Sequence, residues 1–113
     1  MALHERVTIR LYDNDKCFGP GMAQLLERVT EYHSLRAAAI SMALAYSKAW
    51  TMVRRAEAEL GFPLLVSTTG GKGGGGAKLT DEAAALLARY RRLQREVNSF
   101  AKERFEALFI DYI

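Results

Sequence analysis

The chain has 113 residues and a formal net charge of +3, with half of its residues hydrophobic and about a quarter charged. This composition excludes a disordered chain, and the length fits one domain, residues 1–113, with its own core. Cys17 is the single cysteine, so an internal disulfide is excluded, and two histidines elsewhere make a metal-ligand cluster improbable. No stretch approaches the ~20 apolar residues of a membrane span. We expect a cytoplasmic protein with no cofactor, metal or membrane partner.

The net positive charge lies in the middle of the chain. Residues 1–45 and residues 80–113 are each neutral, whereas residues 46–79 hold five cations and two anions. An anionic partner is therefore expected to bind this middle segment.

The first part of the chain predicts a strand, a turn and two helices. Apolar and polar residues alternate over residues 6–12, which predicts a half-buried strand. The turn-forming residues of DNDKCFGPG, residues 13–21, predict that the chain then reverses. Apolar residues spaced at three and four predict a helix over Met22–Tyr32. Ser34 is expected to cap the following helix, LRAAAISM, residues 35–42.

The second part predicts two longer helices with a hairpin between them. After a break at residues 43–45, YSKAWTMVRRAEAELG predicts a helix that ends at Gly61, with Trp50 in its buried stripe. FPLLVSTT and AKLT flank a glycine run, which predicts a hairpin over residues 64–79. Thr80 is expected to cap a final helix over residues 81–112, with acidic residues in its first turn.

Two helices joined by a short break and followed by a hairpin indicate a winged helix-turn-helix. The predicted fold is mainly α with a small β-sheet that forms the wing, and a long C-terminal helix. Residues 5–80 would form a DNA-binding core, with its wing over residues 64–79.

The helix that begins at residue 46 carries hydroxyl and cationic side chains away from its apolar stripe, and these can donate to base edges and phosphates in a major groove. Any one of them alone is more often part of a solvated helix face. As a set beside a basic hairpin they predict binding to double-stranded DNA. The candidates are Tyr46, Ser47, Lys48, Thr51, Arg54 and Arg55.

The run GGKGGGG at residues 70–76 fits a wing tip best. Glycine leaves backbone N–H groups free to approach phosphate oxygens, and Lys72 adds charge. A flexible interdomain linker is an alternative, whereas a P-loop is disfavoured because Ala77 and Leu79 stand where its glycine and its Ser or Thr would be. The wing candidates are Lys72, Gly73, Gly74 and Lys78.

The final helix predicts a homodimer. Its apolar residues follow coiled-coil spacing and then continue after a shift of register, over more length than so small a domain needs to cover itself. The first two turns are expected to pack on the domain's own core. The dimerisation candidates are Leu86, Tyr90, Leu93, Val97, Phe100, Phe105 and Leu108.

The segments GPGMAQLLERV, SLRAAAISMALAYSKAW, ELGFPLL and TGGKGGGGAKLTDEAAALLARY together resemble a known family. They are similar to the N-terminal DNA-binding domain of ModE-type molybdate-dependent transcription regulators and, more loosely, of LysR-type regulators. This resemblance implies a prokaryotic regulator that binds DNA as a homodimer. The final helix would join the two copies. Ala43 and Ala45 depart from the pattern, which usually has a glycine and then a serine cap.

Full-length ModE-type regulators also carry a C-terminal domain that binds the oxyanion, so this chain is expected to act without its own molybdate-binding domain. Two other functions remain open on the sequence. One is a protein-interaction module in which the basic segment is only solubilising. The other is a sensor of a small oxyanion. Paired carboxylates without a convergent base or nucleophile give no catalytic candidate, so an enzyme is not expected.

Overall fold

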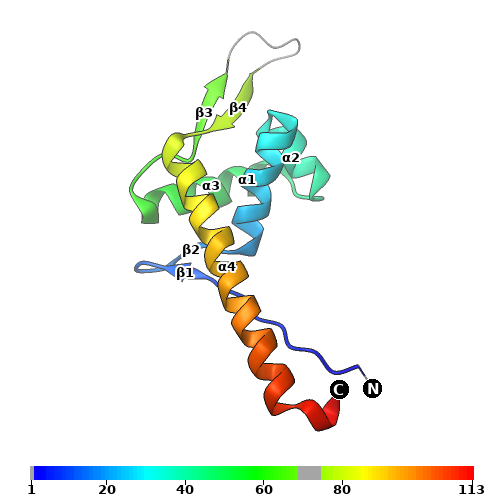
Figure 1. The fold of residues 1–113 in the computed structure, drawn as a ribbon. Coiled ribbons are helices and arrows are strands. Elements are labelled where there is room, and N and C mark those ends of the chain that lie inside the picture. Colours follow the sequence, from blue (N-terminus) through cyan, green and yellow to red (C-terminus); the bar gives the residue numbers. More distant parts are fainter. Residues whose placement is uncertain (1, 69–74) are drawn as a thin grey trace.

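The computed structural model describes residues 2–68 and 75–113 (Figure 1). Its elements are β1 (Leu11–Tyr12), β2 (Lys16–Phe18), α1 (Pro20–Tyr32), α2 (Leu35–Ser41), α3 (Tyr46–Leu60), β3 (Leu65–Thr68), β4 (Gly76–Leu79), α4 (Asp81–Leu108) and a short 3₁₀ helix, η1 (Ile110–Tyr112). β1 pairs with β2 and β3 with β4, each pair antiparallel. Helices α1, α2 and α3 lie together, and α4 extends well beyond them (Figure 1).

Small and branched apolar side chains from α1, α2 and α3 form the core. Ala38 and Ala39 of α2 and Ala49 and Ala56 of α3 are among these buried side chains. Phe18, Leu64 and Tyr90 close the core from β2, from the segment before β3 and from α4. The fully buried helical side chains include Leu25, Leu26, Val29, Ala38, Ala49 and Val53.

Local capping follows the sequence closely. The Ser34 hydroxyl accepts a hydrogen bond from the Ala37 N–H at 3.1 Å, and Gly61 ends α3 in a left-handed conformation at φ 84°. Thr80 accepts from the Ala83 N–H and donates to the Pro63 carbonyl, so one hydroxyl begins α4 and ties it to the chain entering the wing. The expected helix starts and stops at these residues are confirmed.

The N-terminal region differs from expectation. Only residues 11–12 of the predicted strand pair in a sheet, and residues 16–18, expected within a turn, are their partner strand. Val7 and Ile9 are nevertheless more buried than their neighbours. The alternation of apolar and polar residues therefore reflects an extended segment with one side against the domain. Pro20 begins α1 instead of closing a turn, since its missing N–H is not needed at a first helical position.

Tyr90 also differs from expectation. Its side chain is 1% exposed, its ring contacts Phe18 edge-on at 5.1 Å, and its hydroxyl donates to the Ile9 carbonyl at 2.8 Å. Burial raises the pKa of this phenol, which keeps it a donor. Tyr90 therefore belongs to the core of its own domain and cannot line a seam with a second chain. Coiled-coil spacing does not separate the two cases, because both place apolar residues on one helix face.

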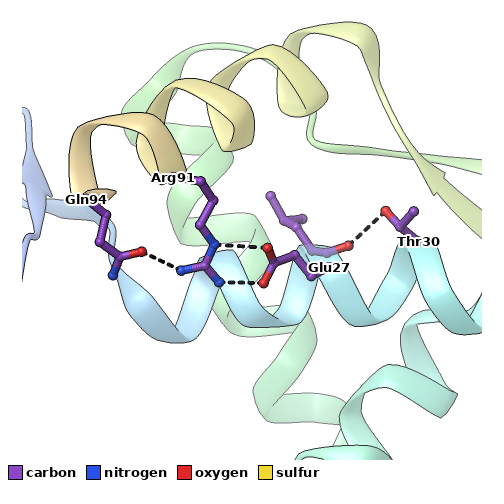
Figure 2. A network of polar contacts seen from close by, with 5 residues as sticks. Glu27, Thr30, Arg91 and Gln94 are labelled. Atoms are coloured by element: carbon purple, nitrogen blue, oxygen red, sulfur yellow. Dashed lines mark hydrogen bonds and ion pairs between the residues drawn. The ribbon is translucent and has the colours of Figure 1, made fainter. Parts of the chain in front are cut away.

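An ion pair joins α4 to α1 one residue beyond Tyr90 (Figure 2). The Arg91 guanidinium donates to both carboxylate oxygens of Glu27, and its third nitrogen donates to the Gln94 side chain at 2.7 Å. This contact lowers the pKa of Glu27 and raises that of Arg91. A bidentate arginine pair is directional, so it adds an oriented contact between α4 and α1 beside the buried Tyr90.

The turn between α2 and α3 keeps the two departures seen in the sequence. Ala43 adopts φ 55°, the left-handed region that favours glycine, and Ala45 begins α3 without a side-chain cap. The N–H groups of Ala43 and Leu44 donate back to the carbonyls of Ile40 and Ala39, which holds the strained residue in place. With the helix-turn-helix and the wing in place, the predicted fold, a winged helix-turn-helix with a long final helix, is confirmed.

The strain at Ala43 predicts a stabilising substitution. Ala43→Gly should raise the free energy of unfolding by roughly 0.5–1 kcal/mol, because relief of the left-handed alanine exceeds the entropy that glycine adds to the unfolded chain. Ala58→Gly is the matched control, since Ala58 is exposed in the regular interior of α3. The control should lose about 1 kcal/mol. Urea unfolding of both variants measures the difference, and a loss at Ala43 would contradict the assignment of strain.

Candidate nucleic-acid interface

One face of α3 is open to solvent and polar. Ala49, Val53 and Ala56 point into the core, and the opposite face is exposed. The exposed predicted residues are Ser47, Lys48, Thr51, Arg54 and Arg55. The Thr51 hydroxyl donates to the Ser47 carbonyl at 3.0 Å. The lone pairs of the Thr51 hydroxyl oxygen and the Thr51 methyl group remain available to an outside partner.

Tyr46 does not share that outward face. It is half-buried at the start of α3, where the Arg36 guanidinium lies 4.2 Å from its ring centroid and its ring meets Trp50 edge-on. Trp50 is likewise half-buried, not enclosed in the core, and Arg54 lies 5.1 Å from its ring centroid. The two aromatic rings thus hold two guanidinium groups beside the outer face of α3.

These aromatic and cationic side chains line a groove between α2, α3 and the wing, here called the wing groove. Its α3 wall is formed by Tyr46, Trp50, Arg54 and Glu57, and its other walls include Arg36 and Ser67. Arg36 was not among the sequence-derived candidates. Nothing in the local sequence marked it, because its contact with Tyr46 depends on the packing of α2 on α3.

Within residues 2–68 and 75–113, the cations of this region have no carboxylate partner. The ion pairs in the described ranges are Arg91–Glu27, which joins α4 to α1, and Arg92–Glu96 within α4. Glu57 also lines the wing groove, where its carboxylate forms neither of these ion pairs but accepts the Leu64 N–H at 2.7 Å and fixes the entry to β3. Positive charge on α3 is therefore available to an outside anion.

The wing stands beside α3 and is joined to the helices by backbone contact. β3 and β4 pair in register, with Val66 opposite Lys78, and Lys78 is exposed. The Ala77 N–H donates to the His33 carbonyl at 3.0 Å, at the junction of α1 and α2. The other wing candidates, Lys72, Gly73 and Gly74, lie outside the described residues.

Gly76 allows that contact. A Cβ at this position would lie 2.8 Å from the His33 carbonyl oxygen and 2.4 Å from the Thr68 hydroxyl oxygen. At least this glycine of the run is needed for docking of the wing onto its own domain, a use that the sequence analysis did not foresee.

A second groove borders α3 on its other flank, here called the hairpin groove. Its α3 wall includes Lys48, Met52, Arg55 and Glu59. Facing them are Arg10, Asp15 and Lys16, from the end of the N-terminal segment and the β1–β2 hairpin. Arg10 and Lys16 were not predicted as site residues, because the sequence analysis placed them in a separate strand and turn.

A family comparison bears on this arrangement. The family model described as the bacterial regulatory helix-turn-helix protein, lysR family, matches residues 22–84, more than half of the chain. The chain belongs to this family. The matched segment runs from α1 through the wing into α4, and the domain is that of a DNA-binding transcription regulator, which is not an enzyme class.

Two curated relatives of this LysR-family domain carry the same name. It is 39% identical over 71 residues to the molybdenum transport protein ModE of Herbaspirillum seropedicae, which covers 63% of this chain and 26% of that protein. It is 36% identical over 76 residues to the molybdenum transport protein ModE of Azotobacter vinelandii, covering 67% of this chain and 28% of that protein. The chain spans about a quarter of the length of these relatives. The resemblance to the ModE-type DNA-binding domain is confirmed.

Within residues 2–68 and 75–113 of this LysR-family domain, no group of three or more His, Cys, Asp or Glu side chains is placed to hold a metal ion. No helix in those same ranges is long and apolar enough to cross a membrane.

The exposed apolar side chains of the LysR-family domain gather toward its C-terminal end. Leu86 and Val97 are half-buried, and Phe105 is half-buried with its ring stacked on Phe109 at 5.2 Å. Phe100 and Leu108 are 65% and 66% exposed. The exposed set on α4 and beyond is Leu93, Phe100, Leu108, Phe109, Ile110, Tyr112 and Ile113, here called the C-terminal apolar surface.

The contact at Gly76 predicts a difference between two adjacent glycines. Gly76→Ala should lower the free energy of unfolding by about 1–3 kcal/mol, because the new methyl group overpacks against a backbone carbonyl. Gly75→Ala is the control, since a Cβ there meets nothing within 4 Å. Thermal unfolding of both variants is the measurement. Equal stability of the two variants would show that the wing does not dock through this contact.

Proposed function

We propose that this chain binds duplex DNA as a homodimer, with the exposed face of α3 in the major groove and the wing on the neighbouring backbone. The observation that carries the proposal is the outer face of α3, where two hydroxyls and three cations are exposed and the cations have no carboxylate partner in the described ranges. A B-DNA major groove admits a helix and offers acceptors on its base edges.

The side chains divide by their position along α3. Ser47, Lys48 and Thr51 lie in its first two turns and are proposed to reach base edges, since the N-terminal residues of such helices enter the groove deepest. Arg54 and Arg36 lie at the wing groove, held against aromatic rings, and are proposed to bind phosphates. Arg55 joins them on the opposite flank. Contacts to phosphates position the protein, and contacts to bases specify the sequence.

The wing is proposed to extend the backbone contact. Lys78 is exposed on β4 beside the wing groove, and docking at His33 holds that strand relative to α3. Lys72, Gly73 and Gly74 join it in the proposal on sequence grounds, as a cation and backbone amides without side-chain bulk.

The homodimer is proposed from the C-terminal apolar surface. Helix α4 has 28 residues, about 42 Å at 1.5 Å per residue, and its first turns already cover the core. Leu93 and Phe100 are seven residues apart and so share a face that is exposed in the single chain. Leu86, Val97, Phe105 and Leu108 flank that face. A second copy covering the same surface would remove a contiguous apolar patch from water.

Lys48→Ala tests the direct reading of bases. The change should cost about 1–3 kcal/mol of binding free energy on the preferred site and relax the preference at one base pair. Lys102→Ala is the control, since Lys102 is an exposed cation near the far end of α4. Titration of preferred and randomised duplexes at fixed salt measures both effects. Equal weakening on every sequence would assign Lys48 to a phosphate, and an unchanged affinity would remove it from the interface.

Phe100→Asp combined with Leu108→Asp tests the dimer. Both positions are exposed in the single chain, so the domain should still fold, but two charges would be buried unpaired at an interface with a second copy. Sedimentation should show a monomer, and binding to a two-fold site should collapse while binding to one half-site persists. Ile40→Asp is the control at an apolar side chain that is 71% exposed elsewhere. A dimer that survives both aspartates would exclude this surface.

A further inference from the structure

We propose that the β1–β2 hairpin binds the sugar–phosphate backbone of duplex DNA on the side of α3 opposite the wing. The inference rests on the proposed placement of α3 in the major groove and adds the partner of the hairpin groove. Arg10 and Lys16 are the residues that would carry the contact, together with Arg55 of α3.

The two grooves lie on opposite flanks of the same helix face. Trp50, Arg54 and Glu57 form one stripe at helical spacing and line the wing groove. Lys48, Met52, Arg55 and Glu59 form a second stripe, which lines the hairpin groove. At 3.6 residues per turn these stripes flank the outward residues Ser47 and Thr51 from the two sides. Figure 1 shows the wing and the hairpin on either side of α3.

A helix in the major groove has a phosphate strand on each side. The groove is ~12 Å wide, so a helix of ~10 Å diameter fills it and its two flanks face the two backbones. The wing can reach one of these strands. The hairpin cations lie on the flank that would face the other strand. A phosphate backbone there offers negative charge and carries no sequence information.

The hairpin is held in position by contacts within the domain. Cys17 and Phe18 of β2 are buried, and the Asp15 N–H points to a carboxylate oxygen of Glu59 at 3.4 Å. The aliphatic stem of Arg10 rests on Gly19, where an added Cβ would lie 3.3 Å from the Arg10 Cγ. The Arg10 and Lys16 side chains are themselves exposed, and neither has an ion-pair partner within residues 2–68 and 75–113.

Two carboxylates share the groove and make the proposal testable in both directions. Asp15 and Glu59 line it with the four cations, so the local balance is positive by two charges, four minus two. Loss of hairpin cations should weaken binding to DNA. Loss of the Glu59 charge should strengthen it, and improved binding cannot come from a folding defect.

The experiment compares three proteins: the double variant that carries both Arg10→Gln and Lys16→Gln, the single variant Glu59→Gln, and the parent chain. Glutamine keeps the aliphatic stem and removes only the charge. The double variant should bind preferred and random duplexes roughly tenfold more weakly and reduce the salt slope by about 2 per protomer. Glu59→Gln should bind several-fold more tightly. Lys102→Gln with Arg104→Gln is the control of equal charge loss, with its oligomeric state checked by sedimentation, and its slope should not change.

Phosphate ethylation interference locates the contact. Within each half-site, the parent should show interference on both strands that border the major groove, and the double variant should lose it on one of the two. A double variant that keeps phosphate interference on both strands, together with the parent's salt slope, would overturn the hairpin contact. The proposed binding of α3 would be unaffected by that result. A parent without salt-dependent DNA binding would overturn the proposed function and, with it, this inference.

Discussion

A single backbone hydrogen bond, from the Ala77 N–H to the carbonyl of His33, fixes the wing relative to the helices. It is possible because Gly76 has no side chain and because His33 ends α1 in a left-handed conformation at φ 58°, which turns its carbonyl toward β4. The wing groove depends on this contact, since it is lined by Trp50 and Arg54 of α3 and by Ser67 of the wing. Thr80 fixes the start of α4 relative to the wing. Its hydroxyl donates to the Pro63 carbonyl, in the chain entering the wing, and also caps α4.

Sequence reasoning was most successful where the determinant is local. Ser34, Gly61 and Thr80 act on residues within four positions of themselves, so the helix ends could be predicted from neighbours in the chain. The outward face of α3 followed from its apolar stripe for the same reason. Tyr46 was the exception, because Arg36 reaches its ring only through the packing of α2 on α3.

The rest could not be predicted because it depends on contacts distant in the chain. Residues 13–21 contain a turn, a strand and the start of a helix, and all three use the same turn-forming residue types. Tyr90 carries the spacing of a seam residue, but its ring contacts Phe18 and its hydroxyl reaches Ile9, 81 residues away. Arg10 and Lys16 become neighbours of α3 only when β2 packs on that helix. When a site is built from several elements, the sequence therefore predicts only the residues that lie on one helix.

The most direct test of the central claim uses the unmodified chain bound to a duplex selected for high affinity. Dimethyl sulfate methylates guanine at N7 in the major groove and adenine at N3 in the minor groove, so one footprint distinguishes the two grooves. If α3 lies in the major groove, guanines in the centre of each half-site should be protected at N7. Tight, sequence-selective binding with every guanine N7 still reactive would contradict the account, because α3 could not then be the element that reads the bases.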